Sequence, residues 1–154
     1  ARTALRSEEQ TVRRWFNVLA LVRGAEAGGR LAVAMDPTHR AVQALLRVDP
    51  NGWAARELDE RRETGLPPFT RSLTVSGEPR AVADFVARTE LDPAWRVLGP
   101  VPLPADDERV RVLVLVPVAD GARLATLTKA ALCATPDRGS PAHLSIRIDA
   151  TTLL

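Results

Sequence analysis

Apolar residues recur at helical spacing over roughly the first 64 of the 154 residues. Three stretches, 7–23, 37–48 and 50–64, carry them on one helical face, and the apolar run 31–35 has the length of a buried strand. Asp36 and Asp49 are each followed by proline, which is typical of a helix N-cap and its first helical residue. This region is therefore predicted to fold as helix, strand, helix, helix.

Beyond residue 69 the spacing changes to the two-residue alternation of strands. Strands are predicted from about residue 70, over 95–103, over 109–118 and over 143–148, with helices that begin at Pro79 and Gly121. Prolines place the second strand at a sheet edge, and the acidic run 106–108 is predicted to be an exposed turn. This order is the ferredoxin-like one, an antiparallel four-stranded sheet with two helices on one face.

The chain is thus expected to belong to the α/β (α+β) class and to contain two domains, residues 1–64 and 65–154. Gly65 ends the third helix, and the two prolines before Phe69 prevent its continuation, because a residue before proline avoids helical dihedrals. With 45% hydrophobic residues and a net charge of +2, the composition excludes a disordered chain. No apolar run approaches the roughly 18 to 20 residues that span a bilayer, so no membrane contact is expected.

Residues that could carry out catalysis or bind a metal are sparse. Cys133 is the single cysteine, which excludes an internal disulfide and fits a reducing cytosol; it is predicted to be buried and inert. His39, expected on a helix surface, is far from His143, and no phosphate loop is present. We therefore expect no catalytic residue, metal or cofactor in this chain. Its only methionine is Met35, which favours a piece of a longer protein.

Three arginines indicate a candidate nucleic-acid-binding surface. Arg109, Arg111 and Arg147 alternate with the core positions of their predicted strands and so share the open face of the sheet, the face on which related architectures bind nucleic acid. Against this, the central strands carry no aromatic residue to stack on bases, and Leu113 and Leu115 share the face. Packing of this face against another protein domain, with arginines at its rim, is the alternative, and the pattern leaves both open.

The stretch from Asp36 to Phe69 resembles the primosomal protein N′ (PriA) family of replication restart proteins. The Glu-Arg-Arg-x-x-Gly-x-Pro-Pro-Phe run at 60–69 is its most specific part. Supporting matches, in the family's order, are Asp36-Pro37, His39, Ala41-Val42-Gln43, Asp49, Glu57-Leu58, Val97-Leu98-Gly99-Pro100, the strand 111–117, Ile146-Arg147-Ile148-Asp149 and Leu153-Leu154.

The resemblance implies a fold and a set of partners. It makes residues 1–64 the end of a degenerate second RecA-like helicase lobe, and 65–154 a domain similar to ribosomal protein S ten that contributes DNA binding. The family comprises ATP-dependent 3′–5′ DNA helicases, whose ATP and zinc are held by residues upstream of this piece. Implied partners are forked or single-stranded DNA, the remaining domains of the parent, single-strand DNA-binding protein and other primosome proteins. A cytoplasmic monomer at the nucleoid is expected.

One departure from the family motif concerns the motor. The family carries Gln-x-x-Gly-Arg-x-Gly-Arg in the helix before the Asp-Pro pair, whereas here Asn17 replaces the glutamine, Leu21 replaces the first arginine and only Arg23 remains nearby. An arginine finger contributes roughly 10³ to 10⁵ in rate, so a parent without helicase activity, similar to the actinobacterial branch, is expected. The alternatives are a fragment of an active helicase and a purely protein-binding ferredoxin-like domain.

Overall fold

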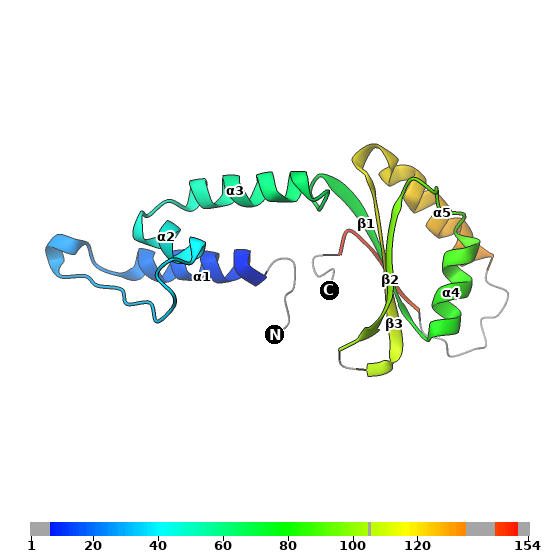
Figure 1. Cartoon of the computed structure of the whole chain (residues 1–154), viewed down its shortest axis with the longest axis horizontal. Helices are drawn as coiled ribbons and strands as arrows, with labels where there is room; N and C mark the ends of the chain where they lie inside the picture. Colours follow the sequence, from blue (N-terminus) through cyan, green and yellow to red (C-terminus); the bar gives the residue numbers. More distant parts are fainter. Residues whose placement is uncertain (1–6, 105, 135–143, 151–154) are drawn as a thin grey trace. The chain divides into compact units, whose positions relative to one another are not determined.

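The computed structural model describes residues 7–104, 106–134 and 144–150 (Figure 1). The chain divides into two compact units, one up to Glu60 and one from Arg61 onward. Within the described ranges, no helix has both the length and the apolar character that crossing a membrane requires.

Helices make up the first unit. α1 (Ser7–Leu21) is followed by the short 3₁₀ turn η1 (Ala25–Ala27), α2 (Arg40–Leu46) and α3 (Pro50–Glu63), whose last turn belongs to the second unit. Their apolar faces meet in a small core of buried Val12, Ala41, Ala44 and Trp53, against which Trp15 and Phe16 pack.

The start of α3 is as predicted, and that of α2 is not. Asp49 Oδ1 accepts a hydrogen bond from Gly52 N at 2.8 Å, as an N-cap does. Asp36 was the predicted N-cap of the preceding helix, but its carboxylate accepts bonds from the backbone and hydroxyl of Thr38. His39 is the N-cap instead, and its Nδ1 accepts from Ala41 N at 3.2 Å. The local Asx turn at Asp36 therefore delays the helix to Arg40.

The predicted strand at 31–35 is absent. These residues run extended without pairing to another strand, and Leu31 and Met35 are 37% and 44% exposed rather than buried. A strand needs a neighbour to receive its backbone hydrogen bonds, and within the described residues none lies beside this segment. Gly29, just before this segment, lies so close to the backbone of Arg23 that a Cβ at position 29 would collide with the carbonyl oxygen of Arg23.

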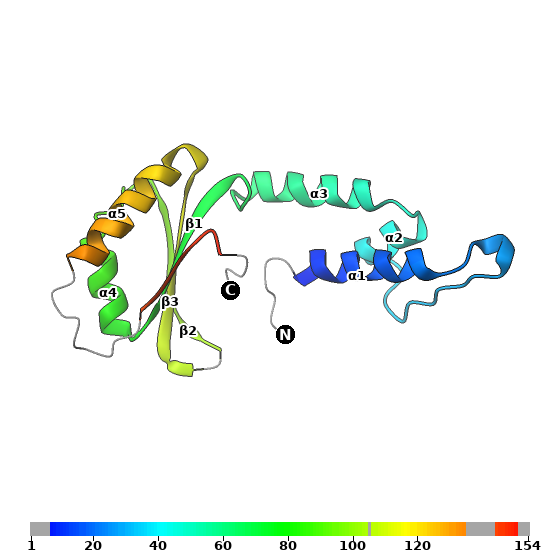
Figure 2. The same cartoon turned by 180° about the vertical axis from the view of Figure 1, so that it is seen from behind.

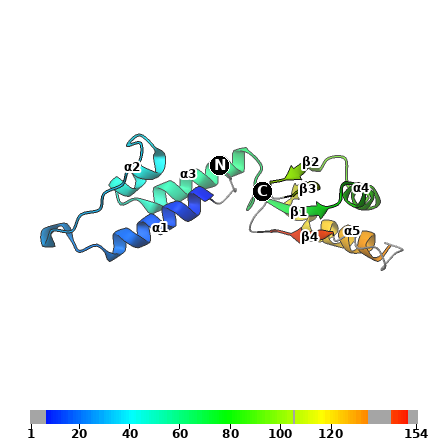
Figure 3. The same ribbon diagram turned by 90° about the horizontal axis from the view of Figure 1, so that it is seen from below.

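The second unit is an α+β layer with one antiparallel sheet. Its elements follow the predicted order: β1 (Thr70–Gly77), α4 (Pro79–Arg88), β2 (Arg96–Leu103), β3 (Asp106–Pro117), η2 (Val118–Asp120), α5 (Gly121–Cys133) and β4 (Ser145–Ile148). The strands lie in the order β2-β3-β1-β4, with every pair antiparallel. Figure 3 shows this order, with α4 and α5 on the same side of the sheet.

The core of this unit lies between the sheet and the two helices (Figure 2). The strands contribute alternate residues, the helices contribute Val82, Phe85, Leu124 and Ala131, and Trp95 closes one side. The buried strand positions are Leu73, Val75, Val112, Val114 and Val116.

The start of β3 differs from the prediction, whereas β4 ends at Ile148 as predicted. The acidic run 106–108 is the exposed start of β3 and not a turn, because Asp106 pairs with Leu103 across the hairpin. Asp149 directly follows β4, and its φ of 50° turns the chain out of the sheet. Its N–H donates to Ser72 O, its Oδ1 accepts from Ser72 N, and its Oδ2 meets Arg71 at 2.7 Å. His143 and the loop predicted over 136–141 lie outside the described residues.

An arginine ties the three helices of the first unit together. Arg40, at the start of α2, contacts Glu8 of α1 at 2.7 Å and Glu57 and Glu60 of α3 at 3.0 and 2.6 Å. The hydrogen bond from Arg40 lowers the pKa of Glu8 below its ordinary value of 4.5, and the pKa of Arg40 is raised by the same bond. Because the folded pKa of Glu8 is depressed, this contribution to stability is present above about pH 4.5 and is lost as pH falls through the folded value.

We predict that Arg40→Met destabilises the first unit by about 1 to 2 kcal/mol at neutral pH, since three carboxylates lose their shared partner and repel one another. Hydrogen exchange of the α1 and α2 amides measures the change. The loss of stability should shrink as pH falls below 4.5 and through the lowered folded pKa of Glu8. Arg13→Met is the control, because Arg13 forms one exposed pair with Glu9. Equal effects of the two substitutions would contradict the prediction.

Candidate nucleic-acid interface

The sheet face turned away from α4 and α5, called the opposite face below, carries the predicted arginines. Cross-strand partners fix its membership, because residues paired side by side point the same way. Thr74 lies between Leu113 of β3 and Arg147 of β4, and Ser76 lies between Arg111 of β3 and Ser145 of β4. Ser72 lies beside Leu115, and Arg109 joins this face by alternation along β3.

Burial divides this face. Ser72, Thr74 and Leu115 of the two central strands are 1%, 5% and 2% exposed, so the centre of the face is as closed as the core. Arg109 and Arg111 are half-buried, and Arg147 is exposed. A ligand therefore meets the exposed Arg147 of the edge strand β4 before it reaches the buried centre of the face.

Two arginines of this face have no negatively charged partner in the described part of the chain. Among the described residues, neither Arg111 nor Arg147 forms an ion pair, and the Nε of Arg111 is buried without a hydrogen-bond partner. The carboxylate nearest in register, that of Asp149, is already engaged by Arg71. Positive charge without a counter-charge is what a polyanion requires of its binding surface.

A fourth arginine was not singled out from the sequence. Arg96 of β2 lies opposite Leu115 and so belongs to this face, and its Nη1 donates to Thr64 O at 2.9 Å. This bond links the sheet edge to the residues that follow α3. The alternation of Arg96 with Val97, which pairs with the core residue Val114, was the available signal, but the prolines later in β2 obscure it.

The residues of the degenerate helicase motif lie apart from any built site. Asn17 is exposed on α1, Leu21 is the last residue of that helix and is 85% exposed, and Arg23 follows the helix in an exposed turn. Arg23 has no ion-pair partner in the described part of the chain. The three are neither brought together around a pocket nor enclosed.

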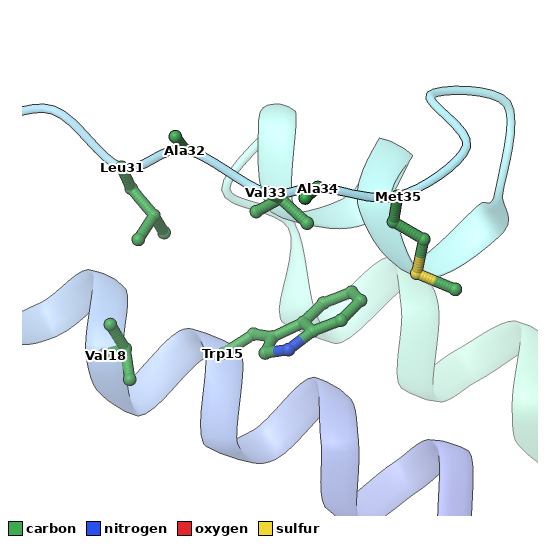
Figure 4. Close-up of a pocket in the computed structure, with 7 residues that line it drawn as sticks. All are labelled: Trp15, Val18, Leu31, Ala32, Val33, Ala34 and Met35. Carbon is green, nitrogen blue, oxygen red and sulfur yellow. The ribbon is translucent and has the colours of Figure 1, made fainter.

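The first unit has an apolar hollow instead of a polar one. A space of about 300 Å³ is lined by Trp15, Val18 and the segment 31–35 (Figure 4). Leu31, Val33 and Met35 point toward α1 while Ala32 points away, an alternation like that of a strand. With no charged or hydroxyl side chain in its lining, the hollow offers no group that would orient a polar ligand.

Two further predicted residues have ordinary surroundings. Cys133 is exposed at the end of α5, so the expectation of a buried thiol was wrong; the last turn of the helix carries it away from the core. His39 serves as a helix cap, as described above. Among the described residues, no three acidic, histidine or cysteine side chains are grouped to hold a metal ion.

Comparison with known proteins identifies the family. The model of the primosomal protein N C-terminal domain matches residues 62–151, which include the whole sheet and both of its helices. The chain belongs to the PriA family. The match extends beyond that domain, because a relative from Mycobacterium leprae, named probable replication restart protein PriA, is 32% identical over 96% of the chain.

A relative of the same name from Mycobacterium tuberculosis is 35% identical over 80% of the chain. These alignments cover 24% and 21% of the relatives' lengths, so the chain spans about a quarter of each. It is the C-terminal portion of a PriA-family protein.

Proposed function

We propose that the chain is the DNA-binding end of a primosomal replication restart protein that recognises stalled forks, and that its parent has no working helicase motor. The observation that carries the DNA-binding part is the placement of Arg111 and Arg147 on one sheet face without an ion-pair partner among the described residues. The printed name of the mycobacterial relatives, replication restart protein, supports the biological setting.

The second unit supports this proposal by its topology. The strand order β2-β3-β1-β4, with both helices on one side, supports the ferredoxin-like domain, similar to ribosomal protein S ten, that the resemblance implies. Such domains present the sheet face without helices to nucleic acid. With no aromatic side chain on that face, contacts go to phosphates, which suits a protein that meets forks of varied sequence.

We propose that the first unit is the end of a RecA-like lobe. Residues 31–35 are extended, apolar on both faces and without backbone partners among the described residues, as a strand of a parallel sheet would be if its neighbours were missing. The remaining strands would come from the preceding part of the parent. Leu21, in place of the family's first motif arginine, supports loss of the motor.

A second candidate function, binding of another protein, has one observation in its favour. Leu98 and Val101 of β2 are 44% and 48% exposed on the opposite face, where Leu98 lies beside buried Leu113 of β3. An apolar strip of this kind is typical of protein contacts. The two candidates differ in which change abolishes binding, because a protein partner would depend on the leucines and DNA on the arginines.

We predict that replacing Arg109, Arg111 and Arg147 together with alanine weakens binding to forked and single-stranded DNA without regard to sequence. The slope of log affinity against log salt should flatten by roughly 2 to 3, since each phosphate contact contributes about 0.7 to 0.9. Fluorescence anisotropy at several salt concentrations measures it. The control is Arg80, Arg88 and Lys129 replaced with alanine, which removes the same charge from exposed positions on α4 and α5. If both triple variants bind DNA like the parent while folded, the face is a protein-packing surface.

For the motor, we predict that the full-length protein shows no ATP turnover above background when forked DNA is added. The reason is the missing arginine at Leu21, which in the family's motif reaches the nucleotide phosphates. A coupled ATPase assay measures the rate. Turnover that rises with forked DNA would establish the alternative of an active helicase.

For the first unit, we predict that the amides of residues 31–35 exchange rapidly in this chain and at least roughly 100-fold more slowly in the full-length protein, where a neighbouring strand would bind them. Hydrogen exchange followed by mass spectrometry measures both. The amides of Val75 and Val114, paired within the second unit, are the internal control and should be slow in both. Equal exchange at 31–35 in the two proteins would show that no strand pairs there.

A further inference from the structure

Three buried polar atoms on the opposite face have no hydrogen-bond partner. They are Ser72 Oγ, Thr74 Oγ1 and the Nε of Arg111; the fourth such atom among the described residues is Trp53 Nε1 in the first unit. Buried polar groups in folded proteins are almost always paired, because an unpaired one costs stability. Three of them on one face, with Ser72 and Arg111 each two residue pairs from Thr74 along the ladder, therefore require an explanation.

The position of the two hydroxyls in the sheet explains why they have no partner. Two buried hydroxyls on the helical side of the unit have partners: Thr89, the C-cap of α4, and Thr128 of α5 each donate to the carbonyl four residues earlier at 2.7 Å. Thr74 lies in a strand with a paired strand on either side, so the neighbouring carbonyls already accept ladder hydrogen bonds. Its hydroxyl points out of the sheet plane, where no acceptor of the described chain reaches it.

The surroundings of Thr74 indicate the chemistry that would pair with it. Arg147 is its direct neighbour on β4, and Arg111 is diagonal to it on β3, at roughly 7 to 8 Å by the geometry of paired strands. Ser72 follows on the same face of β1, about 6 to 7 Å along the strand. Guanidinium groups only donate, and the hydroxyls have their donor unused, so the row calls for an anion with several acceptor oxygens.

We infer that Thr74, with Ser72 and Arg111, binds a phosphate group of a nucleic-acid backbone, and that its hydroxyl lacks a partner among the described residues because that phosphate is its partner. This rests on the proposed function and deepens it, since it places a donor beneath the arginines. Thr74 is 5% exposed, so the phosphate reaches it only when side chains above it shift. Arg147, its exposed neighbour on β4, would be the first group that the phosphate meets.

A buried hydroxyl kept for a ligand has an unusual signature: its removal harms binding and does not harm the fold. Thr74→Val keeps shape and volume but removes the unpaired group. The variant should bind a fluorescein-labelled oligothymidine about tenfold more weakly, the loss expected for one hydrogen bond to a charged group. Its melting temperature should be unchanged or higher by a few degrees.

Two matched variants sharpen the test. Thr74→Ser retains a hydroxyl and should bind like the parent. Thr128→Val removes a buried hydroxyl that is paired inside α5, so it should lower the melting temperature and leave DNA binding unchanged. An oligothymidine with a neutral methylphosphonate backbone should not distinguish Thr74→Val from the parent, because the acceptor charge is gone.

The outcomes separate this inference from the proposed function. If the arginine triple variant loses DNA binding but Thr74→Val binds like the parent, the phosphate does not contact Thr74 and the inference is wrong while the function stands. If Thr74→Val loses affinity and stability together, the hydroxyl is structural and the inference is again overturned. If neither variant changes DNA binding, and an acidic peptide competes for the face instead, both proposals fall.

Discussion

The antiparallel pairing of β1 with β3 is the constraint on which the second unit depends. Eight consecutive residue pairs, from Thr70 opposite Pro117 to Gly77 opposite Val110, join the two central strands. Because side chains alternate with a period of two, this one register directs Val75 and Val112 toward the helices and Thr74 and Leu113 away from them. A slip by one residue would exchange the two faces, so the register that builds the core also sets the arginine positions.

This dependence explains how much of the second unit is readable from its sequence. Alternation at 110–116 places the valines on one side and the arginines on the other, and the strand order then brings Thr74 between β3 and β4. The pattern does not reveal hydrogen-bond satisfaction. Thr74 lies in a strand and its hydroxyl has no hydrogen-bond partner among the described residues, whereas Thr128 lies in a helix and donates to a carbonyl of that helix. This difference depends on atomic positions, which the residue types alone do not give.

The sequence predictions that were wrong have local causes: a short-range interaction, the position of a residue at a helix end, or a missing neighbouring strand. Asp36 and His39 are both capable of capping α2, and the short-range bond to Thr38 engaged the aspartate first. Cys133 has apolar neighbours in sequence, yet the end of a helix carries its side chain past the core. The apolar run 31–35 has the composition of a buried strand, but a strand forms only where another backbone receives its hydrogen bonds.

The two units therefore differ in how far their own residues complete them. In the second, helices cover one face of a four-stranded sheet and a continuous core lies between them. The first has a small core and leaves apolar side chains uncovered, with Leu21, Leu46 and Val48 at 85%, 68% and 65% exposure. Exposed apolar residues that cluster beside an unpaired extended segment are typical of a surface that another part of a protein covers. If the family's motif arginine once stood at Leu21, as the resemblance implies, its replacement exchanged a phosphate-binding side chain for an apolar one. Under the proposed function, the change that would disable a motor would then also favour packing against another part of the protein.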